Sequence, residues 1–201
     1  MSEVTVLIVP GLRDHVAQHW QTLLEARLRE AGRPVVSVAP MGREDLDCAS
    51  RVAAIDAALA RAYGPAVIVA HSGGVIMLVH WARRYRRPVL GALLAAPPDF
   101  EQPMPDGYPT LDALEASGWL SVPREPLPFP SIVAASRNDP LGSFARVSAL
   151  AQAWGSELVD LGEVGHLNPA SGYGDWPQAD AFIARLSESD ATASITAAGR
   201  G

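Results

Sequence analysis

The stretch of residues 67–76 constrains the fold of this chain more than any other. Its first half is a run of apolar, largely β-branched residues, which is typical of a buried strand. From Val75 onward, apolar residues recur at helical spacing instead. The small residues between the two halves hold one serine, Ser72, at the apex of a strand–turn–helix unit. Such units are the building blocks of a sheet that is covered by helices.

A turn of this kind has a known chemical use. In the G-x-S-x-G motif, a strained turn raises the serine hydroxyl above the sheet edge, and the flanking residues are small because strand and helix approach closely. Gly74 supplies the second glycine, whereas Ala70 replaces the first with one additional methyl group. We therefore interpret Ser72 as a candidate nucleophile. The alternative is a glycine-rich turn without catalytic chemistry.

The remaining chain alternates between strand-like and helix-like segments. The apolar runs predict strands over residues 4–9, 35–38, 66–70, 89–95, 131–135 and 157–161. Helical patterns are expected over residues 16–31, 50–63, from the serine turn to about 85, 110–117, 143–154 and 178–186. This alternation predicts an α/β fold, in which about six mostly parallel strands carry helices on both faces.

One connection interrupts the alternation. Residues 97–130 hold nine of the 17 prolines and one short helical pattern. An irregular connection of this length is usually functional or disordered. It follows a strand that ends at the same sheet edge as Ser72, so it is either a small lid over a site or a stiff surface excursion. We expect a single domain over residues 1–187 and a disordered tail over residues 188–201, where small and polar residues dominate.

Composition and charge argue against several classes of function. The net charge is −6, and all 16 basic residues are arginines, so we expect no nucleic-acid partner. The apolar runs are too short to span a bilayer and the start lacks a basic region, so we expect no membrane association and a cytoplasmic location. The single cysteine, Cys48, and the absence of Cys/His ligand spacing predict no internal disulfide, metal or cofactor.

A serine nucleophile needs a base that takes its proton and an acid that orients the base. In folds with this motif, the order along the chain is serine, acid, histidine. Of the five histidines, His166 lies in a loop after the last predicted strand, and we expect it to be the base. The others precede the serine, lie directly beside it or follow in its helix. The alternative for His166 is a solvated loop histidine without a role.

Two aspartates compete for the role of the acid. Asp139 follows the fifth predicted strand, whereas Asp160 lies within the sixth. A residue in a loop can swing its carboxylate over the sheet edge, but a residue within a strand is fixed to one face. We therefore expect Asp139 to orient His166. The alternative for Asp139 is a turn aspartate, which is common before proline.

An acyl-transfer intermediate also needs two N–H donors for its oxyanion. We expect them to be the backbone amides of Gly73, directly after the serine, and Leu12, in the loop after the first strand. Trp20 and Trp176 are candidates for the pocket wall. Trp20 also fits the apolar stripe of its helix, and Trp176 could instead anchor its loop to the protein body.

Seven short motifs carry a resemblance to a known family. They are Val9-Pro10-Gly11, His19-Trp20, Ala70-His71-Ser72-Gly73-Gly74, Pro128-Phe129-Pro130-Ser131, Ala135-Ser136-Arg137-Asn138-Asp139-Pro140, Gly165-His166-Leu167-Asn168 and Gly174-Asp175-Trp176-Pro177. In this order they resemble the small serine hydrolases like retinoblastoma-binding protein 9 and its bacterial relatives, in the α/β-hydrolase superfamily. The resemblance implies a minimal α/β-hydrolase fold without a large cap and a catalytic triad of Ser72, Asp139 and His166.

Members of that family look like esterases or peptidases on small substrates, and some are described mainly as binding proteins. We therefore expect a serine hydrolase that cleaves an ester or related acyl bond of a small-molecule substrate through an acyl-Ser72 intermediate. A carboxylesterase-like activity is favoured, and peptidase or thioesterase activity stays open. The alternative is a low-turnover protein-binding module on a hydrolase scaffold, for which the sequence indicates no particular partner.

Overall fold

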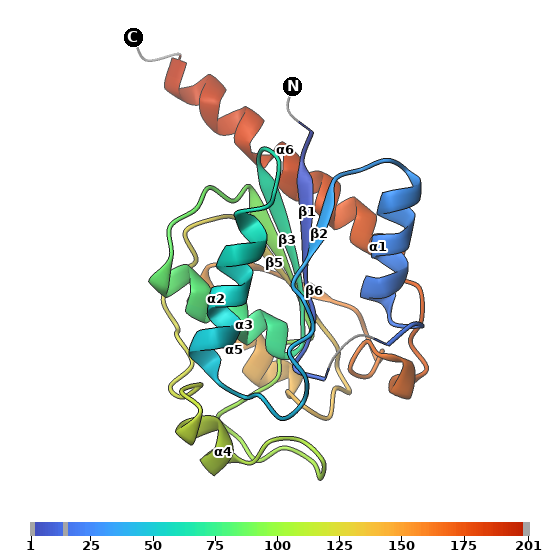
Figure 1. Ribbon diagram of the computed structural model, residues 1–201, viewed down its shortest axis with the longest axis vertical. Helices are drawn as coiled ribbons and strands as arrows, with labels where there is room; N and C mark the ends of the chain where they lie inside the picture. The colour runs from blue at the N-terminus through green and yellow to red at the C-terminus, as the bar shows by residue number, and fades with distance from the viewer. Residues whose placement is uncertain (1–2, 14–15, 199–201) are drawn as a thin grey trace.

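The computed structural model describes residues 3–13 and 16–198 (Figure 1). Within these residues, six strands form one sheet in the order β2-β1-β3-β4-β5-β6, and every neighbouring pair is parallel. The strands are β1 (Thr5–Val9), β2 (Val35–Ser37), β3 (Ala66–His71), β4 (Gly91–Ala95), β5 (Ser131–Ala135) and β6 (Glu157–Asp160). The parallel α/β sheet predicted from the sequence is confirmed, and each strand lies where an apolar run predicted it.

The central strands are buried along their whole length, as expected for a parallel sheet with both faces covered. β1, β3, β4 and β5 have only buried positions. Their side chains alternate between two apolar cores, one on each face of the sheet. In β3, Ile68 and Ala70 belong to one core, whereas Val67 and Val69 belong to the other.

Helices form a layer on each face of the sheet (Figure 1). One layer is α1 (Trp20–Glu30) and α6 (Gln178–Ala198). The other is α2 (Cys48–Leu59), α3 (Gly73–Arg84) and α5 (Phe144–Trp154). The short helix α4 (Leu111–Ala116) belongs to the proline-rich segment and lies beyond the lower end of the sheet in Figure 1. No large cap domain is inserted within the described residues.

Three helices differ from their predicted bounds by four residues or more at one end. α2 ends at Leu59 rather than residue 63, because the N–H groups of Arg61 and Ala62 donate to carbonyls three residues back instead of four. α1 begins at Trp20 rather than residue 16, because His19 has an extended backbone and its Nδ1 accepts a hydrogen bond from the N–H of Gln21 (3.2 Å). α6 continues past residue 186 to Ala198, through most of the tail that we expected to be disordered. That segment contains no glycine or proline before Gly199, so nothing in it breaks a helical backbone. The last residues of the predicted tail, 199–201, lie outside the described residues.

The order of the strands reverses beside β1. The chain passes from β1 to β2 on one side of it and then returns to place β3 on the other side. In open α/β sheets, such a switch leaves a crevice at the C-terminal ends of the strands, where ligands bind. The loop after β1 and the turn after β3 meet there, so the fold places Leu12 and Ser72 at the same edge.

Candidate active site

Ser72 lies at the predicted turn between β3 and α3. Its backbone angles, φ 54° and ψ −131°, fall in a region that residues other than glycine rarely occupy. The N–H of Ser72 donates to the carbonyl of Ala95 on β4 (2.9 Å), which ties the strained turn to the sheet. A Cβ at Gly74 would lie 2.5 Å from the carbonyl oxygen of Pro10, so only glycine lets α3 begin this close to β1.

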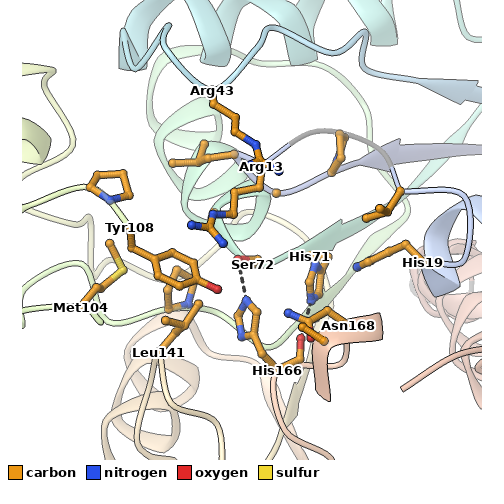
Figure 2. Close-up of a pocket in the computed structure, with 18 of the residues that line it drawn as sticks. Arg13, His19, Arg43, His71, Ser72, Met104, Tyr108, Leu141, His166 and Asn168 are labelled. Atoms are coloured by element: carbon orange, nitrogen blue, oxygen red, sulfur yellow. Dashed lines mark hydrogen bonds between the residues drawn. The ribbon is translucent and has the colours of Figure 1, made fainter. Parts of the chain in front are cut away.

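The hydroxyl of Ser72 meets the imidazole of His166. Oγ of Ser72 lies 2.8 Å from Nε2 of His166, and Nδ1 of the same ring lies 2.7 Å from Oδ2 of Asp139 (Figure 2 shows the first contact). When Nδ1–H donates to the carboxylate, Nε2 accepts the hydrogen bond from the hydroxyl. The side chains of His166 and Asp139 are only 5% and 2% exposed. The structure thus brings together the three residues that we expected as nucleophile, base and acid.

The two competing aspartates have different partners. Asp139 also accepts a hydrogen bond from the N–H of Leu141 (2.8 Å), so both of its carboxylate oxygens are engaged. Asp160, at the end of β6, accepts hydrogen bonds from Nε of Arg137 (2.7 Å) and the N–H of Gly162 (2.9 Å). The hydrogen bond from Arg137 lowers the pKa of the Asp160 carboxyl. The structure therefore places Asp139, and not Asp160, against His166.

Hydrogen bonds tie the loop that carries His166 to its surroundings. Oδ1 of Asn138 accepts from the N–H of Gly165 (2.7 Å), so the loop of the acid and the loop of the histidine are joined directly. Oγ of Ser171 accepts from the N–H of His166 itself (3.0 Å). These bonds fix the backbone around the imidazole, which is what a positioned base requires.

His71 has a place in this site that sequence reasoning missed. The residue is 4% exposed, and its Nε2–H donates to the carbonyl of His166 (2.9 Å). Burial lowers the pKa of His71 well below that of a free imidazole, and the neighbouring rings of His166 and His19 lower it further. A neutral His71 holds the His166 loop without adding a positive charge beside it. The sequence carried no signal for this contact, because only the fold brings residue 166 within reach of residue 71.

Both expected oxyanion donors lie beside the nucleophile. Gly73 is the first residue of α3, so its N–H has no acceptor within the helix. The side chain of Leu12 packs over this position, since a Cβ on Gly73 would lie 2.6 Å from Cγ of Leu12. Gly11 lies directly against the serine, and a Cβ there would be 3.2 Å from Cβ of Ser72. Binding of an oxyanion by these two amides stays a prediction.

A cavity of about 280 Å³ opens beside Ser72 and His166 (Figure 2). Leu12 and Gly73 are part of its lining, as are His19, Gln21 and His71. The proline-rich segment supplies another wall, which consists of Pro98, Phe100, Met104, Tyr108 and Pro109. Part of the segment 97–130 therefore borders the site, and its opening and closing as a lid stays a prediction.

The two tryptophans expected at the pocket wall are not part of the described lining of this cavity. Trp20 is fully buried and Trp176 is 4% exposed. Their rings pack edge to face, with 4.9 Å between centroids, in the core beneath α1 and α6. The pocket interpretation is wrong for both, because the apolar stripe of α1 turns Trp20 toward the sheet, and Trp176 anchors its loop onto Trp20.

The cavity lining also includes Arg13, Arg43 and Tyr108, which we did not predict as site residues. The guanidinium carbon of Arg13 lies 3.9 Å from the centroid of the Tyr108 ring, and the guanidinium also donates to the carbonyl of Gly107. Figure 2 shows the Arg13 side chain reaching toward Ser72, with Arg43 above it. Arginines occur throughout the chain, so no pattern in the sequence distinguished these two.

The described part of the chain holds no cluster of three or more His, Cys, Asp or Glu side chains that could bind a metal ion. Among the same residues, no helix combines the length and apolar character needed to cross a membrane. Cys48 is buried, and burial raises the pKa of its thiol to about 11, so it is a poor nucleophile at neutral pH.

Solved structures of other proteins resemble this chain over most of its length. A protein described as a YdeN-like hydrolase from Pectobacterium atrosepticum is 32% identical, with a TM-score of 0.75 over 92% of this chain and 91% of its own. The ydeN gene product from B. subtilis is 18% identical, with a TM-score of 0.73 over 92% of this chain and 99% of its own. Est1E from Butyrivibrio proteoclasticus, with ferulic acid bound, is 14% identical, with a TM-score of 0.62 over 82% of this chain and 81% of its own.

The last two similarities concern the fold alone, because their sequence identities are low. No match to this chain is found among curated proteins. The model of the family described as serine hydrolase matches residues 6–185, which is most of the chain. Together with the 32% identical hydrolase structure, this match shows that the chain belongs to the serine hydrolase family, within the α/β-hydrolase superfamily.

Proposed function

We propose that this protein hydrolyses an ester or related acyl bond of a small substrate through an acyl-enzyme formed on Ser72. The observation that carries the proposal is the pair of hydrogen bonds from Ser72 to His166 and from His166 to Asp139, beside an open cavity. A serine is activated in this way when nucleophile, base and orienting acid lie within hydrogen-bond distance of one another.

In the first half of the proposed reaction, Nε2 of His166 takes the proton of the Ser72 hydroxyl as Oγ attacks the substrate carbonyl. The negative charge that develops on the carbonyl oxygen is held by the N–H groups of Leu12 and Gly73. The tetrahedral intermediate then collapses, and the protonated His166 gives its proton to the departing alkoxide. The alcohol leaves, and the acyl group stays on Ser72.

In the second half, a water molecule takes the place of the alcohol. His166 removes a proton from this water as the oxygen attacks the acyl carbonyl. The second intermediate collapses with the proton returned to Oγ of Ser72, which releases the acid and restores the hydroxyl. Throughout, Asp139 accepts the hydrogen bond from Nδ1–H, which keeps His166 in one orientation and stabilises its imidazolium form.

The test is covalent labelling with an organophosphonate probe, since an activated serine attacks phosphorus and an ordinary turn serine does not. We expect stoichiometric labelling that maps to Ser72 by peptide mass spectrometry and is lost in Ser72→Ala. Ser187→Ala is a matched control and should be labelled like the wild type, because the Ser187 hydroxyl donates to the Ile183 carbonyl on α6 and is not part of the described cavity lining. A folded protein that remains unlabelled would contradict the proposal and favour a binding module on this scaffold.

A series of phenyl esters would then define the acyl group. Acetyl, butyryl and longer esters, compared with a phenyl thioester and an anilide of the same acyl group, separate esterase from thioesterase and amidase activity. We expect the ester to be the best substrate, with short acyl chains preferred over bulky ones because the proline-rich segment borders the cavity. The closer resemblance to retinoblastoma-binding protein 9 stays a prediction, and no protein-binding role is proposed from it.

A further inference from the structure

The cavity beside Ser72 has a charge opposite to that of the whole protein. The protein carries a net charge of −6, yet the charged side chains in the described lining of the cavity are Arg13 and Arg43, with no aspartate or glutamate among them. The remaining wall is largely apolar and includes Phe100, Met104 and Leu141. An apolar wall weakens the screening by water of any charge that enters, so the two guanidinium groups act on a ligand here more strongly than on the open surface.

Arg13 is held in place before any ligand arrives. Its guanidinium stacks on the ring of Tyr108, 3.9 Å from the ring centroid, and donates to the carbonyl of Gly107. A guanidinium has five N–H donors in a planar fork, so this carbonyl leaves further donors for a second acceptor. None of the described ion pairs of the protein involves Arg13 or Arg43. In contrast, Arg146 on α5 binds the carboxylate of Asp99 (2.6 Å).

Figure 2 shows where these groups point. The guanidinium of Arg13 lies between the Tyr108 ring and Ser72, and the Arg43 side chain extends toward Arg13 from the loop after β2. Arg13 and Arg43 both line this one cavity, so their positive charges repel each other when the site is empty. An anion beside Arg13 lowers that repulsion and can accept hydrogen bonds from the Arg13 guanidinium.

We infer that the substrate carries an oxyanion group, a carboxylate or a phosphate, several bonds away from the scissile acyl carbonyl, and that Arg13 and Arg43 bind this group. The inference rests on the proposed hydrolysis at Ser72 and adds the class of substrate to it. A planar guanidinium fork matches the two oxygens of a carboxylate or phosphate. Arg13 makes the direct contact, and Arg43 adds attraction at the mouth of the cavity.

Matched ester pairs test the inference and locate the anion. Monophenyl adipate against phenyl hexanoate places a carboxylate on the acyl side. The acetyl esters of 4-hydroxybenzoate and 4-hydroxybenzamide place the carboxylate on the leaving group. The acetyl ester of 4-hydroxyphenyl phosphate carries a phosphate at that position instead, so it compares phosphate with carboxylate. The measured quantity is the ratio of kcat/KM for the anionic ester to that for its neutral partner. Comparing this ratio between variants cancels the intrinsic reactivities of the two esters.

We expect the wild type to favour the anionic member of at least one pair by about 10-fold, the size of one charge-assisted hydrogen bond. Arg13→Met should remove most of this preference, because it keeps the apolar stem but has no charge, and Arg13→Lys should retain part of it. Arg43→Met should lower the ratio by about threefold, since an exposed charge acts weakly across water. Arg61→Met is the matched control and should leave the ratio unchanged, because Arg61 follows α2 at the opposite edge of the sheet.

Equal rates for every pair in the wild type, or an unchanged ratio in the Arg13→Met/Arg43→Met double variant, would overturn the inference. If Ser72 reacts with neutral esters and shows no preference for anions, the inference fails and the proposed hydrolysis stands. Calorimetric binding of monophenyl adipate and phenyl hexanoate to Ser72→Ala decides the question without turnover. If Ser72→Ala binds the adipate more tightly than the hexanoate, but Ser72 of the wild type does not react, the anion site is supported and the proposed hydrolysis is contradicted.

Discussion

The two halves of the cavity are built in different ways. In one half, Ser72, Asp139 and His166 are joined by hydrogen bonds of 2.8 and 2.7 Å, and two of these three side chains are almost completely buried. In the other half, Arg13 and Arg43 are exposed and lie on loops that meet the proline-rich segment. Three strands of one sheet, β3, β5 and β6, position the first half, whereas loop contacts position the second.

This difference has consequences for the chemistry. Leaving a buried donor or acceptor without its partner costs about 1–3 kcal/mol, whereas an exposed cation–π contact contributes about 0.5–1 kcal/mol. Changes in the buried half should therefore lower turnover, and changes in the exposed half should alter the choice of substrate. The comparison indicates that reaction chemistry and substrate preference reside in separable parts of this site.

The largest effect is expected from breaking the buried half at its acid. Asp139→Asn should lower kcat/KM by at least about 100-fold, because an amide removes the charge and can hold the wrong tautomer of His166. Asp160→Asn is the matched control and should stay within about threefold, a difference of under 1 kcal/mol. The assay is ester hydrolysis, compared between variants whose melting temperatures match, so that both are equally folded. If Asp160→Asn were the inactive variant, the assignment of the acid would be wrong.

A smaller effect is expected from the histidine that holds the His166 loop. His71→Phe keeps a ring but removes the hydrogen bond to the His166 carbonyl, and we expect kcat to fall by about 10-fold, or 1.4 kcal/mol, with little change in KM.

His80→Phe is the matched control for His71→Phe. His80 lies on α3 away from the cavity, is also buried, and donates from Nε2 to the carbonyl of Trp119 (3.1 Å). Both variants should lose stability, but only His71→Phe should lose turnover and shift the pH profile of kcat/KM. Equal losses of turnover would show that the effect of His71 is not specific to the site.

The buried histidines also predict how stability depends on pH. Burial lowers the pKa of both His71 and His80 in the folded protein. Below the unfolded pKa, near 6.5, the unfolded chain therefore binds protons that the folded protein does not, and the free energy of unfolding falls as pH decreases. The slope is at most about 1.4 kcal/mol per pH unit for each histidine.

Urea unfolding at pH 7.0, 6.0 and 5.0 measures this dependence. The loss of stability on acidification should be smaller in His80→Phe than in the wild type, because one of the two protonation sites is absent from the unfolded chain. The contribution of carboxylates cancels in that difference. Identical slopes in the two proteins would mean that His80 is not held neutral by burial.

The smallest effect is expected where the proline-rich segment borders the cavity. Met104→Ala removes apolar volume from that wall, and the ratio of hexanoyl to acetyl ester hydrolysis should rise by about 4-fold, the value of about one buried methylene. Leu120→Ala, in the same segment but outside the described lining, is the control and should leave this ratio unchanged. An unchanged ratio in Met104→Ala would favour the interpretation of the segment as a surface excursion.

Much of the fold could be predicted because its signals are local. The runs that became β3 and β5 hold five and four consecutive apolar residues, at 66–70 and 132–135, and a parallel sheet needs nothing more to bury them. The start of α1 was missed because its cap is a histidine side chain, His19, rather than one of the usual capping residues. The extent of α6 was missed because a small, polar composition is compatible with both helix and disorder.

The candidate site was predicted unevenly for a related reason. Ser72, Asp139 and His166 follow β3, β5 and β6, and the C-terminal ends of parallel strands meet at one edge, so their order in the chain was informative. The aromatic residues were not informative, because an amphipathic helix or an anchored loop uses a tryptophan as readily as a pocket does.

The sequence by itself determined the strand–turn–helix unit around Ser72, the parallel sheet and the edge at which three chemically matched residues converge. These features follow from hydrophobic periodicity and chain order, which a few neighbouring residues encode. Only the tertiary structure decided that Arg13 rests on Tyr108 at the cavity and that His71 holds the carbonyl of His166. Each of these two contacts joins residues that are 95 positions apart in the chain. Each depends on how separate loops pack, which no local pattern specifies.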